Sequence, residues 1–552
     1  MNRAARGEAA PVQAFDFIIV GAGSSGCVLA ARLSEDPDCK VLLLEAGGQD
    51  RHPLMRMPLA FFPLMRDPKV SWPYKTEPEP YAENRVLELP RGKLLGGSSS
   101  INGMMYARGH PRDYDEWRQL GLDGWSYADV LPYFRRIETS WRGAGPYHGG
   151  SGPLSVVPNH VADDNVGPAV MATARARGLK VIDDFHGPEQ EGFSTPEFTI
   201  RDGRRASTAD AYLHPAMARP NLTVETGALT SRVLLEKGRA VGVEYLQDGQ
   251  VRTARAEREV VLCGGAYNSP QLLMLSGIGP ADELKDAGVT PVHDLQGVGR
   301  NLQEHPAAGV VYAASGPIGF ESELRFDRMA ASVIRWALTG TGPASRLPIS
   351  AMAFIKTRPE LERPDIQMLF SPVGMDAVVW FPLLRKGKGH TVSLAGTLLR
   401  PESRGWVKLR SADPRDPPRI QLNLFAEPAD LAALRRSTRF IREFMAEQPA
   451  AGLVRGEVFP GPQVQTDAAL DAVMRANCAT AHHPTSTCAM GTGEDAVTDA
   501  ELKVRGIEGL RVADASVMPR IIGGNTNAPA IMIGEKAADL LRGRAPAGAD
   551  AS

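Results

Sequence analysis

The chain lacks the paired cysteines of a disulfide-stapled or zinc-stabilised protein. Its cysteines are few, odd in number and scattered, and none form a CxxC pair: Cys27, Cys39, Cys263, Cys478 and Cys488. This pattern argues against a disulfide framework and against a structural zinc site. We therefore expect a reducing compartment, the cytoplasm.

Long apolar runs and an excess of one charge are also missing. No stretch approaches the roughly 18 uninterrupted apolar residues of a spanning helix, so we expect no transmembrane anchor. The N-terminal MNRAARGEAAPVQA has no apolar core, so we expect no secretory signal. The 62 basic and 64 acidic residues nearly cancel. That balance argues against nucleic acid as a partner, because phosphates call for a concentrated basic surface.

What the chain does have is glycine in short loops, first in an N-terminal strand–helix–strand unit. Residues 15–20 (FDFIIV) are typical of a buried strand, GAGSSG follows, and residues 40–48 (KVLLLEAGG) predict a second strand. The three glycines of a G-x-G-x-x-G turn permit close approach to a pyrophosphate, and an acid about 20 residues later binds ribose hydroxyls. The unit predicts dinucleotide binding by Gly21, Gly23, Ser24, Ser25, Gly26, Glu45 and Ala46.

Segments far from the N-terminus also look built to contact a ligand. RGKLLGGSSSINGMMYARG (91–109) is a second Gly/Ser loop, and residues 257–279 predict a strand, a Gly–Gly turn and a helix from about Ser269. Residues 510–516 predict a short strand that ends near Asp514. Residues 523–541 predict a polar loop that enters a helix with Pro529 in its first turn. Contacts from both ends of the chain favour an extended FAD over NAD.

The stretch TAHHPTSTCAMG (480–491) sets His482 beside His483. Adjacent side chains on an extended segment point apart, and no nearby ligand spacing completes a metal shell, so we expect no metal site. A histidine also suits a catalytic base, because its pKa lies near neutrality. From these residues alone, a structural role for His483 is favoured over a role as a base.

Taken together, these segments resemble the glucose–methanol–choline (GMC) oxidoreductases over nearly the whole chain. The motifs that carry the resemblance are RGKLLGGSSSINGMMYARG, GAYNSPQLLMLSGIG, HHPTSTCAMG and VADASVMPRIIGGNTNAPAIMIGE, and they look most like the bacterial alcohol and choline dehydrogenase branch. The resemblance implies an α/β fold in which a Rossmann-like FAD-binding domain (1–157, 203–310 and 476–552) is interleaved with a substrate domain. The substrate domain (158–202 and 311–475) would carry an antiparallel sheet with helices.

The resemblance also implies the roles of individual residues. The family's catalytic histidine precedes a proline, which makes His483 the expected base. We assign the second family position, a His or Asn that holds the substrate oxygen, to Asn527. The helix from about Pro529 would point its N-terminus at the flavin. Further FAD contacts are expected from Trp72, Gly96, Gly97, Ser98, Asn102, Gly103, Met104, Val233, Asp514, Ala515, Asn525 and Thr526.

Three positions qualify this picture. Relatives that bind FAD covalently use a histidine where this chain has Ile101, so we expect non-covalent FAD. Many relatives have glycine where this chain has Ser486, which bears on the local backbone and on pocket width. We expect His482 to pack beside the base rather than to act.

The apolar, proline-rich segment 57–72 is expected to be a lid over the flavin, with a membrane-touching patch as the alternative.

The implied activity is FAD-dependent oxidation of a primary alcohol to an aldehyde. Choline is one open substrate, although no acid or aromatic cage can be assigned to its trimethylammonium group. A different reading is a lyase of the hydroxynitrile type, which binds FAD without net redox chemistry. Oxygen and a quinone are both open as electron acceptor, as are a homo-oligomer and, for a quinone-linked enzyme, association with the inner membrane.

Overall fold

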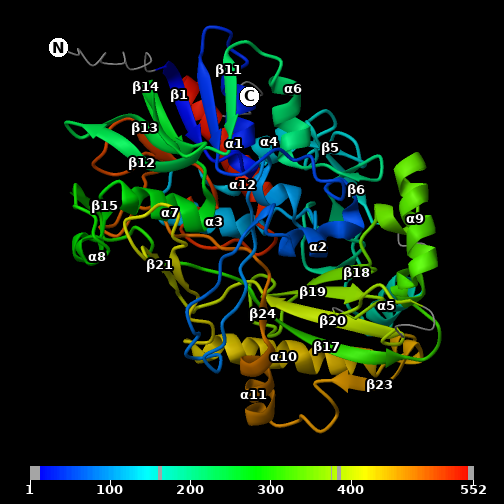
Figure 1. Ribbon diagram of the computed structural model, residues 1–552. Helices are drawn as coiled ribbons and strands as arrows, with labels where there is room; N and C mark the ends of the chain where they lie inside the picture. The colour runs from blue at the N-terminus through cyan, green and yellow to red at the C-terminus, as the bar shows by residue number, and fades with distance from the viewer. Residues whose placement is uncertain (1–12, 160–163, 375, 382–386, 545–552) are drawn as a thin grey trace, which may run out of the picture.

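The computed structural model describes residues 13–159, 164–374, 376–381 and 387–544. Residues 1–12, where we expect no secretory signal, lie outside the described part. Two seven-stranded sheets organise the molecule, one in the upper half of Figure 1 and one in the lower half. Each sheet is assembled from segments far apart in the sequence. The predicted mixed α/β fold is confirmed.

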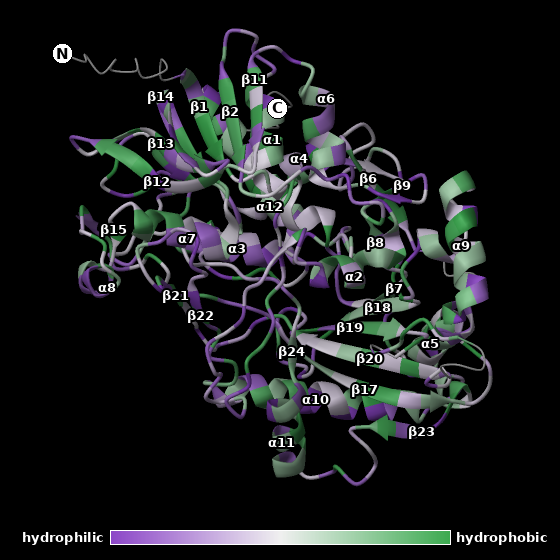
Figure 2. Cartoon of the chain, viewed as in Figure 1, coloured by the Kyte–Doolittle hydropathy of each residue, from purple (hydrophilic) through white to green (hydrophobic). Residues whose placement is uncertain are grey.

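The first sheet contains the N-terminal strand–helix–strand unit. Its central parallel strands, β1 and β2, are largely buried apolar runs, as expected where both faces of a sheet are covered, and they appear green in Figure 2. Two antiparallel strands extend one edge. In order, the strands are β11 (Leu222–Thr226), β2 (Val41–Glu45), β1 (Ala14–Val20), β14 (Gln250–Leu262), β13 (Arg239–Gln247) and β12 (Leu229–Glu236), with β25 (Leu510–Val512) beside β14.

Two helices from opposite ends of the chain pack together beside this sheet. They are α1 (Ser24–Leu33) and α12 (Asn527–Arg542), and both begin at the cavity described below. Gly534 of α12 permits their close approach, because a Cβ there would lie 2.9 Å from the carbonyl oxygen of Ser25. The sequence places α12 correctly, with Pro529 in its first turn.

The helix after β14 starts earlier than the sequence suggests. α7 runs Gly265–Leu275, so Pro270 lies inside it and not near its start. A proline inside a helix deprives the carbonyl four residues earlier of its N–H partner. Here that carbonyl belongs to Ala266, and the Thr487 hydroxyl donates a hydrogen bond of 2.7 Å to it. The hydroxyl of Thr487, 221 residues away in sequence, therefore replaces the missing hydrogen bond and permits α7 to begin at Gly265.

The second sheet is antiparallel throughout. Helix α10 (Pro428–Met445) covers one of its faces and buries Leu434, Ile441 and Phe444, as the lower part of Figure 1 shows. In order, the strands are β23 (Val454–Phe459), β17 (Pro306–Ala314), β20 (Thr391–Leu398), β19 (Ile366–Ser371), β18 (Ala351–Ile355) and β7 (Gly192–Ser194), with β24 (Ala479–Thr480) beside β17.

The remaining elements surround the two sheets. The helices are α2 (Phe61–Arg66), α3 (Pro111–Gln119), α4 (Tyr127–Ile137), α5 (Val166–Ala176), α6 (His214–Ala216), α8 (Ala281–Asp286), α9 (Phe326–Thr339) and α11 (Asp467–Asn477). Small sheets pair β3 (Ser71–Trp72) with β4 (Arg91–Gly92), β9 (Ile200–Arg201) with β10 (Arg204–Arg205), and β15 (Ile278–Gly279) with β16 (His293–Asp294). Others join β5 (Glu138–Ser140), β6 (Leu154–Pro158) and β8 (Glu197–Phe198), and β21 (Trp406–Lys408) with β22 (Arg419–Gln421).

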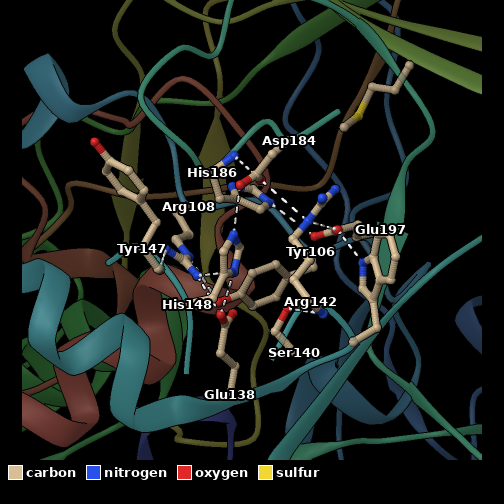
Figure 3. Close-up of polar contacts among 12 residues, drawn as sticks. Tyr106, Arg108, Glu138, Ser140, Arg142, Tyr147, His148, Asp184, His186 and Glu197 are labelled. Carbon is tan, nitrogen blue, oxygen red and sulfur yellow. Dashed lines mark hydrogen bonds and ion pairs between the residues drawn. The ribbon is translucent and has the colours of Figure 1, made fainter. Parts of the chain in front are cut away.

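A buried polar cluster ties residues 106–148 to residues 184–197 (Figure 3). His148 lies between two carboxylates, with Nδ1 2.8 Å from Glu138 and Nε2 2.8 Å from Asp184. Arg108 donates to the same Glu138 oxygen at 2.7 Å. Burial opposes a charge on His148, but the bonds to Asp184 and Glu138 raise its pKa to about 9. These four groups form a charged cluster that lies away from the cavity described next.

Candidate active site

One cavity of about 1370 Å³ lies between the two sheets and reaches both ends of the N-terminal glycine unit. It exceeds the usual 300–1,000 Å³ of a ligand site, so it has room for more than one small molecule. Its lining comes from both halves of the molecule. Helix α2, within the predicted lid segment 57–72, borders it through Phe61, Phe62 and Met65.

The glycine unit has the geometry that a dinucleotide needs. Gly21 adopts φ +101°, and a Cβ there would lie 2.6 Å from the carbonyl oxygen of Cys263. A Cβ on Gly26 would meet the Gly21 carbonyl oxygen at 1.9 Å. Helix α1 has no side-chain cap, so its first amide groups are available to phosphate oxygens. The residues present therefore fit the pyrophosphate of FAD.

Glu45 lies at the end of β2, beside these glycines. Its carboxylate accepts hydrogen bonds from the amides of Ala22 (2.9 Å) and Gly47 (2.8 Å). Burial raises its pKa to about 7, although those two bonds favour the charged form. A carboxylate held in this way is oriented toward the cavity, where it can accept from ribose hydroxyls.

Most of the predicted FAD contacts line this cavity, and three do not. Gly26 and Gly96 instead allow tight turns, and Val233 is buried under the neighbouring lining segment 228–230. The predicted residues in the lining are Gly21, Gly23, Ser24, Ser25, Glu45, Ala46, Trp72, Gly97, Ser98, Asn102, Gly103, Met104, Asp514, Ala515, Asn525, Thr526 and Asn527. Ile101 borders the cavity as well.

His483 also borders the cavity, 8% exposed. Its neighbours have unusual backbones, with φ +61° at His482 and +77° at Ser486. Both values lie in the left-handed region that favours glycine, so Ser486 keeps the backbone shape that a glycine would adopt there. His482 packs at the cavity wall, where Arg91 donates to its carbonyl oxygen at 2.8 Å.

The asparagine that faces His483 is Asn525. Its Nδ2 lies 3.1 Å from His483 Nε2, and its Oδ1 accepts from Gln367 Nε2 at 3.2 Å. Asn527, which we expected in this position, is two residues further on, as the first residue of α12. Its Oδ1 accepts from Ser24 Oγ at 2.7 Å. The two asparagines point in different directions because the chain turns into α12 between them. The side chain of Asn527 is directed toward α1, and that of Asn525 toward the second sheet.

A buried histidine on the far side orients the His483 ring. His305 Nδ1 lies 3.0 Å from His483 Nδ1, and His305 Nε2 lies 3.1 Å from the carbonyl oxygen of Leu399. Because a carbonyl only accepts, His305 must carry its proton on Nε2, which leaves Nδ1 as an acceptor. His483 must then donate from Nδ1. Its Nε2 is left unprotonated, with a lone pair that accepts from Asn525 Nδ2 at the edge of the cavity.

Hydrogen bonds therefore run in one direction from the second sheet to the base and beyond. Gln367 donates to Asn525, Asn525 to His483, His483 to His305, and His305 to Leu399. Burial, with the nearby charges of His305, Arg91 and His482, holds the pKa of His483 well below 6.5. The imidazole is consequently neutral at physiological pH and able to accept a proton.

Glu304 supports this arrangement from behind. Its Oε1 accepts from the amides of His483 (2.7 Å) and His305 (2.9 Å). Burial raises its pKa to about 7. The sequence did not point to Glu304, His305, Gln367 or Arg91 as site residues. The first three lie in no motif and are more than 100 residues from His483. Arg91 opens the 91–109 motif, and that position was its only signal.

Family models now identify the chain. The two models named GMC oxidoreductase, N-terminal and C-terminal, match residues 15–307 and 401–534. The chain is a GMC oxidoreductase. The predicted family is thereby confirmed, as is an FAD-dependent oxidoreductase that acts on CH–OH donors.

Several GMC relatives match over nearly their whole length. The mitochondrial choline dehydrogenase of Mus musculus is 44% identical, with 96% of this chain and 89% of that protein covered. An oxygen-dependent choline dehydrogenase of Paraburkholderia phymatum is 46% identical, with 96% and 93% covered.

Among solved structures, pyridoxine 4-oxidase from Mesorbium loti has a TM-score of 0.87 at 32% identity, covering 96% of this chain and all of that one. A formate oxidase of Aspergillus oryzae RIB40 has a TM-score of 0.88 at 29% identity, with 97% and 99% covered. In the described residues, no helix is both long enough and apolar enough to cross a bilayer.

Proposed function

We propose that this GMC oxidoreductase oxidises a primary alcohol to an aldehyde, with His483 as the base and Asn525 holding the substrate oxygen. The observation that carries the proposal is the one-way hydrogen-bond chain, which leaves His483 Nε2 unprotonated at the cavity with its lone pair held by the Asn525 N–H. Asn525 offers an N–H donor beside that lone pair. An alcohol oxygen placed between the two would donate its proton to His483 and accept from Asn525.

The proton is thereby removed while the developing oxygen charge keeps a hydrogen-bond donor. When bound, FAD supplies the acceptor for the hydride that leaves the alcohol carbon, so the alcohol loses two electrons and two hydrogens to become an aldehyde. The uncapped N-terminus of α12 borders the cavity, and its partial positive charge favours an electron-rich group there.

The cofactor is held without a covalent bond in this proposal. Ile101 is 2% exposed, packs among apolar side chains and has no nucleophile. Acid precipitation should leave the flavin in the supernatant, and colour in the pellet would contradict this part. The domain ranges inferred from the sequence stand as a proposal, with two adjustments: β17 (from Pro306) and β24 (Ala479–Thr480) both lie in the second sheet.

The proposal also covers the electron acceptor, the location and the oligomeric state of the enzyme. The electron acceptor is oxygen or a quinone, and the enzyme resides in the cytoplasm or at the surface of the inner membrane, as a monomer or a homo-oligomer. Activity with oxygen and with a quinone-like dye, assayed in parallel, separates the acceptors. The relatives named choline dehydrogenases favour choline as a second candidate substrate.

Two asparagines offer a matched test of the active-site assignment. Asn525→Ala should lower the rate of anaerobic flavin reduction by about 100-fold, the effect of losing one oxyanion donor. Asn527→Ala removes the bond to Ser24 and should cost far less in that rate, while weakening FAD retention. The reverse ranking would return the role to Asn527. A hydroxynitrile lyase would cleave cyanohydrins while no alcohol bleached the flavin.

A further inference from the structure

The second sheet forms the floor of the substrate half of the cavity, and its cavity-facing side chains are small. Strand registers align alternate residues of β17, β20 and β19 in rows that face the cavity, and of the residues between them Ala308 and Leu394 also border it. The rows, which we call the sheet floor, are Ala307–Thr397–Gln367, then Gly309–Ala395–Leu369, then Val311–Ser393–Ser371.

Apart from Gln367 and Leu369 on β19, the large side chains of these strands lie on the other face of the sheet. Val310, Val392, Met368 and Phe370 alternate with the floor residues and are buried on the opposite side of the sheet. Ala395 at the centre of the floor is half-exposed toward the cavity. The small residues therefore leave a trough between the sheet floor and a roof that includes Phe61 and Leu347.

The trough begins at the reacting groups and leads away from them. Gln367 of the first row donates to Asn525, so that row lies beside His483. Strand β20 runs beside the cavity from Thr397 to Thr391, six steps along the strand, or about 20 Å at 3.3 Å per residue. An extended chain advances about 3.5 Å over three bonds, so the trough matches roughly 17 bonds.

The first two rows do not suit a cation. In choline the ammonium is two carbons from the hydroxyl, so it would lie over Ala307, Gly309 and Ala395. A buried cation needs a carboxylate or a box of aromatic faces. No residue of these rows carries an aromatic ring; the aromatic side chains of the described lining come from other segments: Phe61, Phe62, Trp72, Tyr267 and Phe459. In the described lining, the carboxylates are elsewhere: Glu45 and Asp514 accept from backbone amides at the dinucleotide end, and Asp376 pairs with Lys388 at the far end.

The groups closest to the base strengthen this conclusion. Arg91 lines the cavity and already places one cation beside His483. Glu304, the nearest buried acid, is outside the lining and holds the amides of His305 and His483. A quaternary ammonium would therefore meet a like charge without a counter-charge.

We infer that the substrate of this site is an uncharged, elongated primary alcohol that lies along the sheet floor, and not choline. The inference rests on the proposed function. It assigns the rows of the sheet floor as the residues that select chain length. The hydroxyls of Thr397 and Ser371 also face the trough, so occasional oxygen atoms along the chain are compatible with it.

A series of linear alcohols tests the inference on the FAD-loaded enzyme. Anaerobic flavin reduction is measured with ethanol, butan-1-ol, octan-1-ol, dodecan-1-ol and choline. Each methylene buried in the trough should raise kcat/KM by about fourfold until the trough is filled. Binding is measured separately on His483→Ala, through the perturbation of the flavin spectrum by butan-1-ol and dodecan-1-ol, and dodecan-1-ol should bind the more tightly.

Variants locate the effect on the sheet floor. Ala395→Phe fills the second row and should reduce kcat/KM for dodecan-1-ol about tenfold more than for butan-1-ol. Ser371→Phe fills the third row and should reduce kcat/KM for dodecan-1-ol about tenfold more than for hexan-1-ol. This second variant tests the inference if Ala395→Phe does not fold. Val251→Phe adds a ring at an exposed position of β14, outside the lining, and should leave the profile unchanged.

The outcomes separate the two proposals. Choline as the best substrate, or a kcat/KM that ignores chain length, overturns the inference and leaves alcohol oxidation in place. Equal losses for long and short alcohols in both floor variants also overturn it. Flavin that no alcohol reduces, choline included, overturns the proposed function and the inference with it.

Discussion

The orientation of the base gives the sharpest prediction, because His305 fixes it through a single carbonyl. In His305→Phe, the Nδ1–H of His483 loses its acceptor inside the protein. A buried donor left without a partner costs about 1–3 kcal/mol. The ring can avoid that cost by moving its proton to Nε2. The Asn525 amide would turn over so that its oxygen accepts from Nε2–H, and Nε2 would then have no lone pair to offer the alcohol.

The penalty therefore appears as a shift from the competent to the incompetent form of the base. A bias of 1–3 kcal/mol corresponds to a loss of about 5- to 150-fold in the population of the competent form. We expect the limiting rate of anaerobic flavin reduction to fall by this factor. The flavin content and the alcohol dissociation constant should change little, since neither depends on which nitrogen carries the proton.

His305→Gln is the matched control. Its amide keeps one acceptor, for His483, and one donor, for the Leu399 carbonyl, and should restore most of the rate. Stopped-flow reduction with a saturating linear alcohol measures all three proteins. A His305→Phe rate within about threefold of the wild type, or a Gln variant as slow as the Phe variant, would refute the role of His305 in orienting the base.

Three further perturbations test other parts of the structure. Gly21→Ala should abolish FAD retention, measured by bound flavin, because its Cβ would lie 2.6 Å from the Cys263 carbonyl oxygen at φ +101°; a fully loaded variant would contradict this. His148, with a folded pKa of about 9 against 6.5 unfolded, stabilises the fold below pH 6.5 and loses that effect as the pH rises to 9. The difference in free energy of unfolding between wild type and His148→Asn should therefore shrink by up to about 3 kcal/mol over that interval. A difference that stays constant with pH in urea titrations would exclude the mechanism. Thr487→Val leaves the Ala266 carbonyl unpaired and should lower the unfolding free energy by about 1–3 kcal/mol, whereas Thr487→Ser should not.

The sequence alone determined the local chemistry of the cofactor site. The glycine turn, α1 and Glu45 are contiguous, and their roles follow from steric limits on glycine and from helix-end amides, both properties of neighbouring residues. The His-Pro motif likewise placed His483 at the cavity. Short-range rules sufficed wherever the interacting groups were close in the chain.

Tertiary structure decided everything that depended on distant partners. The start of α7 depended on Thr487, and the choice between Asn525 and Asn527 depended on how α12 enters against α1 and Gln367. The sheet floor exists only because β17, β20 and β19 align in one register. A hydrogen bond or a packed row is set by relative position in space. Residues such as His305 and His483, 178 apart in sequence, acquire that relation only when the chain folds.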